Sequence, residues 1–155
     1  MNGRSYKNSP LFVLAAFALL LGACTETMTE VDDAHAEPEG VHLVMGGNVF
    51  ATYDGETQTW TGELEGEVGQ ETPHITVRFV DHEGDPIPID DDLYLDVQVQ
   101  DESIAEFGQD TPGEFGGHLH GEMAGETGGT FSLMHGAVGA GHPDFVTQPA
   151  PAHIR

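Results

Sequence analysis

Histidines that could bind a metal are concentrated near the C-terminus of this 155-residue chain. Four of the nine histidines lie at His118, His120, His135 and His142, and Asp144 follows the last of them closely. Imidazole nitrogens and carboxylate oxygens are ligands of divalent transition metals, and three or four around one point suit zinc, copper(II) or nickel. The pattern therefore favours a zinc or copper site formed by these five residues.

Strand geometry would have to bring these ligands together. Residues two apart on a β-strand share a face, so His118 and His120 would stand side by side outside if Leu119 points into the core. A following hairpin is expected to place the strand 130–134, and His135 at its end, beside this pair. The glycine-rich loop 136–144 would then fold its histidine and aspartate back toward the pair.

Two other interpretations of the histidines stay open. Surface histidines are often only polar surface or turn residues, and clustered imidazoles in an acidic field can also act as a pH sensor. Methionines near the site would extend the choice to copper(I), although methionine next to an apolar strand is more often packing. The other histidines are dispersed, and we interpret them as tether or surface residues: His35, His42, His74, His82 and His153.

The charge of the chain is strongly acidic. All 27 acidic residues lie beyond Cys24, where Arg78 and Arg155 are the only basic ones, and the net charge of the whole chain is −23. Such a field repels nucleic acid and anionic membrane surfaces and concentrates cations. The acids are spread along the chain, so solubility in a saline habitat explains them at least as well as a ligand does.

The N-terminal segment has the features of a secretory signal. Arg4 and Lys7 precede an apolar run over 11–21, which is too short to span a membrane and ends in Leu-Gly-Ala-Cys. This ending resembles the lipobox of bacterial lipoproteins, which implies cleavage before Cys24 and acylation of its sulfur, for example with palmitate. Thr25, where an aspartate would mark inner-membrane retention, implies by the same resemblance the outer membrane of the cell envelope.

We therefore expect three parts. Residues 1–23 form the signal peptide, residues 24–40 an acidic flexible tether without apolar periodicity, and residues 41–155 one folded domain.

No catalytic residues are indicated. Cys24 is the only cysteine, so once it is acylated no thiol remains for a disulfide, a cysteine ligand or a nucleophile. Ser103 and Ser132 do not lie in a G-x-S-x-G elbow. The sequence thus predicts a protein that is not an enzyme.

Short alternating runs broken by Gly, Asp and Pro predict an all-β fold. In 74–80, for example, apolar residues alternate with polar ones, so that one face lies in the core. The closing segment 145–151 is expected to be an edge strand because its prolines cannot donate ladder hydrogen bonds, with His153 at a frayed end. The other expected strands are 41–45, 49–53, 59–64, 74–80, 93–99 and 130–134.

Two motifs resemble the group 2 bacterial immunoglobulin-like family. They are DESIAEF at 101–107 and GEMAGET at 121–127, followed by the apolar strand 130–134. The resemblance covers about the last third of the domain and implies an Ig-like antiparallel β-sandwich used at the cell surface, with no catalytic residues to carry over. The His-Leu-His at 118–120 and the insertion over 135–145 depart from the family pattern, and sandwich packing alone does not require those histidines.

The sequence thus predicts a lipid-anchored envelope protein. It would bind zinc or copper for buffering, delivery or sensing, with the membrane and another envelope protein as partners and no nucleic acid. The alternative is a structural or protein-interaction Ig-like module whose histidines are incidental.

Overall fold

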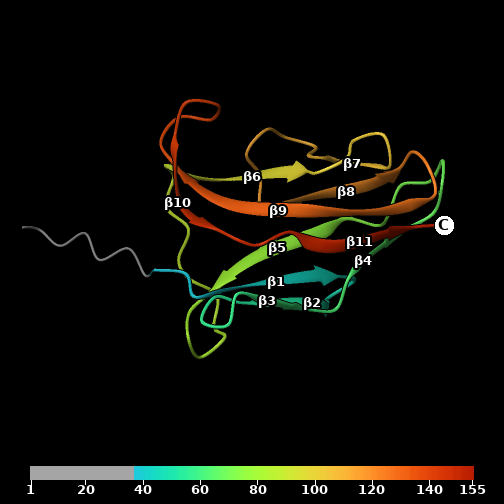
Figure 1. Cartoon of the computed structure of the whole chain (residues 1–155). Coiled ribbons are helices and arrows are strands. Elements are labelled where there is room, and N and C mark those ends of the chain that lie inside the picture. The colour runs from blue at the N-terminus through green and yellow to red at the C-terminus, as the bar shows by residue number, and fades with distance from the viewer. Residues whose placement is uncertain (1–36) are drawn as a thin grey trace, which may run out of the picture. The chain divides into compact units, whose positions relative to one another are not determined.

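The computed structural model describes residues 37–155; the expected signal peptide, Cys24 and most of the expected tether lie outside the described residues. All regular secondary structure in this part of the chain is β-strand (Figure 1). Within it, no helix has the length and hydropathy needed to cross a membrane. The expected all-β class is confirmed, because eleven strands form two curled, mainly antiparallel sheets of a β-sandwich.

The first sheet has six strands in the order β3-β2-β1-β5-β8-β7. Neighbouring strands in it are antiparallel throughout. The sheet curls so that β7 approaches β6 of the second sheet (Figure 1). Its strands are β1 (Gly40–Met45), β2 (Asn48–Asp54), β3 (Thr59–Thr61), β5 (Ile75–Val80), β7 (Ala105–Gly108) and β8 (Gly116–Gly121).

The second sheet is organised around the long strand β9 (Gly125–His135). One edge of β9 pairs with β6 (Leu93–Val99). Its other edge pairs first with β11 (Ala150–Ile154) and then, toward His135, with β10 (His142–Val146). Strand β4 (Leu64–Gly66) lies on the far side of β11, and this is a parallel pair.

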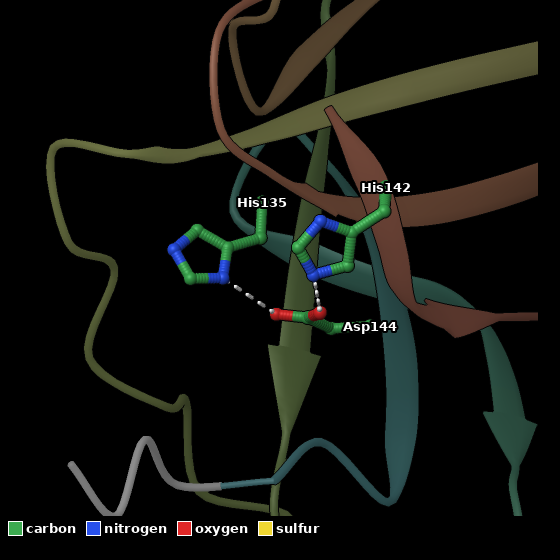
Figure 2. A group of neighbouring side chains, drawn as sticks. All are labelled: His135, His142 and Asp144. Carbon is green, nitrogen blue, oxygen red and sulfur yellow. Dashed lines mark ion pairs between the residues drawn. The ribbon is translucent and has the colours of Figure 1, made fainter. Parts of the chain in front are cut away.

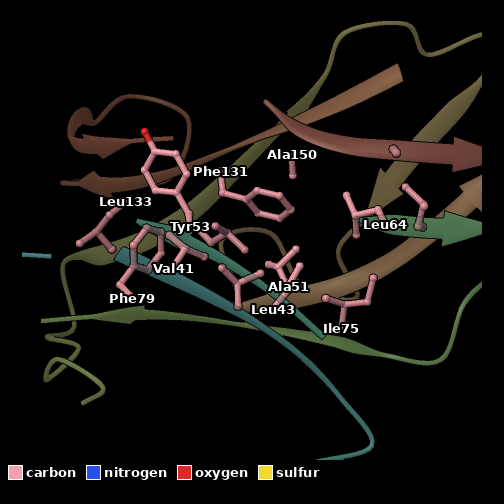
Figure 3. Close-up of a cluster of buried hydrophobic side chains, with 14 of the residues drawn as sticks. Val41, Leu43, Ala51, Tyr53, Leu64, Ile75, Phe79, Phe131, Leu133 and Ala150 are labelled. Atoms are coloured by element: carbon pink, nitrogen blue, oxygen red, sulfur yellow. The ribbon is translucent and has the colours of Figure 1, made fainter. Parts of the chain in front are cut away.

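The core between the sheets is aromatic and aliphatic (Figure 3). Phe131 of β9 is fully buried, and its ring centroid lies 5.8 Å from those of Trp60 on β3 and Phe107 on β7. The Trp60 indole Nε1 donates a hydrogen bond of 2.7 Å to the carbonyl of Gln148, between β10 and β11. These contacts fasten the two sheets together.

Most expected strands are present, but the segment 59–64 is broken. Gly62 has a φ of 91° and separates β3 from β4. A Cβ at this position would lie 2.3 Å from the carbonyl oxygen of Phe50, so the close approach of the two backbones requires glycine. At this break the chain passes from the first sheet to the second. The alternation of apolar residues does not show where such a crossing occurs.

The expectation of a C-terminal edge strand over 145–151 with a frayed end is correct only for 145–146, which lie in the edge strand β10. The chain forms β10 and then β11, and β11 is an internal strand between β9 and β4. Ala150, Ala152 and Ile154 alternate in the core at 0%, 4% and 1% exposure. The two alanines bury too little surface to stand out as a strand pattern. Pro151 is exposed, lies opposite Gly128 and precedes Ala152, where the pairing with β4 begins.

Candidate metal centres

The five residues predicted to form one metal site lie on strands of different sheets. His118 and His120 are on β8, whose neighbours are β5 and β7, whereas His135 ends β9 in the second sheet. The expected β8–β9 pairing is therefore wrong, because the chain crosses from one sheet to the other at 122–124 instead of closing a hairpin within one sheet. The predicted set divides into two separate clusters.

The first cluster is formed by His135, His142 and Asp144, which we call the β9–β10 site (Figure 2). Each residue offers one ligand atom, and these three atoms lie within 4.8 Å of one another. His135 Nδ1 is 3.6 Å from Asp144 Oδ2, and His142 Nε2 is 3.3 Å from Asp144 Oδ1. The loop folds His142 and Asp144 back to His135, and not toward the pair His118 and His120 as expected.

Strand register explains why these side chains meet. His142 of β10 lies directly opposite His135 of β9, so the two rings are cross-strand neighbours with centroids 5.3 Å apart. The register then shifts between Pro143 and Phe145, which leaves Asp144 as the extra residue of a β-bulge. Bulges redirect side chains. Here the Asp144 carboxylate lies between the two imidazoles, as Figure 2 shows.

The orientation of His135 is set by a second carboxylate. Its Nε2–H donates a hydrogen bond of 2.8 Å to Asp92 Oδ2, immediately before β6. With the proton on Nε2, the lone pair of the neutral ring lies on Nδ1 and faces Asp144. A histidine that ligates a metal commonly donates its other ring N–H to a carboxylate in this way, which fixes the tautomer and makes the ligand more basic.

The separations in this site fit a tetrahedral ion. Ligand bonds of about 2.0–2.1 Å to zinc place neighbouring donor atoms about 3.3 Å apart, and two bound imidazoles have ring centres roughly 5 Å apart. The side chain of His142 is 70% exposed and those of His135 and Asp144 are 31% and 32% exposed. Three protein ligands leave a fourth position open, so an ion could enter and leave from solvent.

The second cluster surrounds the His118 and His120 pair. Leu119 is 1% exposed, and both histidines lie on the outer face of β8, as predicted. Glu71 bridges the pair: its Oε1 is 3.1 Å from His118 Nδ1 and its Oε2 is 3.3 Å from His120 Nε2. The connection between β4 and β5 positions Glu71, because it runs along β8 and makes an isolated bridge at Glu71 and His120.

His118 has a defined tautomer. Its Nδ1 lies 2.8 Å from the carbonyl oxygen of Thr72, which can only accept, so Nδ1 carries the proton. The hydrogen bond to Thr72, followed by the charges of Glu71 and Asp110, raises the pKa of His118 above its ordinary value despite partial desolvation. Its other nitrogen, Nε2, lies 3.5 Å from Asp110 Oδ2.

Several residues of the two clusters were not identified from the sequence. Asp92 lies in the acidic run 90–92, and nothing in that run distinguishes it from its neighbours. The histidine immediately before β5, His74, was set aside as dispersed. These residues lie in long connections between strands, and no sequence pattern in the connections shows that they approach β8 or β9. The same is true of Glu71, Asp110 and Glu114.

Comparison with protein-family models, curated proteins and solved structures gives no significant match to this chain.

Proposed function

We propose that this protein is a lipid-anchored protein of the bacterial envelope that binds a divalent transition metal, zinc or copper, at the β9–β10 site. The observation that carries the proposal is the convergence of His135 Nδ1, His142 Nε2 and the Asp144 carboxylate, with Asp92 holding the His135 ring. Two imidazoles and one carboxylate are a common set of protein ligands for zinc.

Reversible binding suits this site better than a structural role for the ion. The sandwich has its own aromatic core, and the site lies at the end of β9 outside that core. Structural zinc sites are closed by four protein ligands, whereas an open position and an exposed His142 allow exchange. The acidic surface raises the local cation concentration. We infer buffering, delivery or sensing of the ion rather than catalysis.

Titration of the metal-stripped full-length protein with zinc in detergent tests the proposal. At micromolar zinc and physiological salt, we expect saturable binding and stabilisation against unfolding, by about 2.7 kcal/mol when free zinc is 100 times Kd. The acidic surface alone would give weak binding that salt abolishes. Absence of saturable binding for both zinc and copper would reject the metal-binding function.

The alternative is an interaction module with incidental histidines. It is favoured by the ion pairs of each cluster, which can stabilise the loops without any metal when the histidines are protonated. In that case the metal-stripped protein would have the same stability with and without zinc, and the loops would bind a protein partner instead.

Lipid anchoring is proposed from the sequence at Cys24 and has its own test. Replacing Cys24 by serine removes the only sulfur that can be acylated. We expect the wild-type protein to incorporate labelled palmitate and to fractionate with the membrane, and the C24S variant to lose the label and most of its membrane association. Equal palmitate labelling of both proteins would contradict the anchor.

A further inference from the structure

A second group of potential ligands lies beside β8, formed by His74, Asp110 and Glu114. One nitrogen or oxygen atom from each residue lies within 4.8 Å of the other two. His74 immediately precedes β5, and both acids lie in the connection 109–115 between β7 and β8. These residues share no ligand with the β9–β10 site.

His118 is a potential fourth donor that lies next to this group but is not among the three residues whose ligand atoms are all within 4.8 Å of one another. Because its Nδ1–H is held by the Thr72 carbonyl, the lone pair of the neutral ring lies on Nε2, which is 3.5 Å from Asp110 Oδ2. The His118 and His74 ring centroids are 5.2 Å apart, close to the roughly 5 Å expected for two imidazoles on one tetrahedral ion. A backbone carbonyl is one of the usual acceptors that orient a ligating histidine.

The backbone is shaped to admit the His74 ring. A Cβ at Gly116 would lie 2.3 Å from His74 Cε1 and 2.8 Å from its Nε2, so the ring occupies the space that any other residue would fill. Gly116 is the residue at which β8 begins.

The connection 109–115 holds its own backbone and the Glu114 carboxylate in place through hydrogen bonds. Glu114 Oε1 accepts the backbone N–H of Asp110, and the Gln109 side chain donates to the carbonyls of Glu114 and Leu95. The Glu114 carboxylate is therefore fixed by a contact that does not need an ion, which lowers the cost of binding one. The Asp110 side chain is 68% exposed, and its carboxylate contacts His118.

We propose that His74, Asp110, Glu114 and His118 form a second metal site, the β7–β8 site, for a divalent transition ion. Its two carboxylates make it a harder donor set than the β9–β10 site, so it suits zinc or manganese(II) better than copper(I). The inference is separate from the proposed function, because either site can exist without the other.

The test counts zinc equivalents in three full-length proteins after metal removal, by titration at micromolar zinc and physiological salt. The proteins are the wild type, H135A/H142A, and the quadruple variant that adds H74A and D110N. We expect two zinc equivalents for the wild type, one for H135A/H142A and none for the quadruple variant. A matched control adds H153A and E102Q to H135A/H142A instead, and should keep one equivalent. Near-UV circular dichroism checks that each variant is folded, and H74Q/D110N replaces H74A/D110N if that pair unfolds the protein.

The outcomes separate the two sites. If H135A/H142A binds no zinc while the wild type binds one equivalent, or if binding needs millimolar zinc, the β7–β8 site is rejected. If H135A/H142A binds as many equivalents as the wild type and loses one with H74A/D110N, the β7–β8 site stands and the β9–β10 site is rejected. Retention of zinc by the folded quadruple variant overturns the assignment of these ligands.

Discussion

Replacing His135 and His142 together by alanine is expected to weaken zinc binding at the β9–β10 site by at least about 100-fold. Removing only a group that hydrogen-bonds a metal ligand already lowers metal affinity by about 10- to 100-fold, and this variant removes two of the ligands themselves. The double variant removes both nitrogen donors and leaves Asp144 alone on its bulge. Competition with a chromophoric chelator measures the change in Kd for the full-length protein in the H74A/D110N background, which removes the β7–β8 site.

A variant of Asp92 tests the residue that orients a ligand rather than a ligand itself. Asp92→Asn preserves the shape of the side chain that accepts from His135 Nε2 but removes its charge, so we expect an intermediate loss of about 10- to 100-fold. The matched control is H82A/H153A, which removes two histidines outside both clusters and should leave the affinity unchanged. Equal affinity of H135A/H142A and this control would show that zinc binds elsewhere.

Replacing Phe131 by alanine is expected to lower the free energy of unfolding by about 3–5 kcal/mol. Phe131 is fully buried, and its ring packs against Trp60 of one edge strand and Phe107 of the other edge strand of the first sheet. Its truncation leaves a cavity between the sheets that the β-sandwich can fill only by moving whole strands.

Chemical denaturation measures this effect, with a lower midpoint and an unchanged slope expected. Val138→Ala is the control, since Val138 is 56% exposed in the loop before β10 and its loss should change stability by less than about 0.5 kcal/mol. A destabilisation by Phe131→Ala as small as that of the control would contradict the described core.

The local pattern of the sequence was sufficient to predict the outer face of β8. Alternation around buried Leu119 correctly placed His118 and His120 side by side, because side-chain direction on a strand depends only on its period of two. The same reasoning failed for the partner of β8. Which strands pair is decided by the whole sheet, and β8 pairs with β5 and β7 rather than with β9.

The bulge at Asp144 and the contact of Asp92 with His135 also depend on strand pairing and could not be predicted from the local sequence. The sequence identified His135, His142 and Asp144 as potential ligands, but not the β-bulge that directs Asp144 between the rings. Asp92 is 43 positions from its partner His135, and the two meet only because β6 pairs with β9 along its length. Individual ligands could be predicted from residue type and spacing, whereas contacts between distant segments depend on the register of the strands.

Anomalous scattering at the zinc edge, from crystals of the zinc-loaded protein, locates the bound ion and tests the β9–β10 site directly. We expect a peak within about 2.0–2.2 Å of His135 Nδ1, His142 Nε2 and an oxygen of Asp144. Zinc in the crystal with no peak between these three side chains would contradict this expectation.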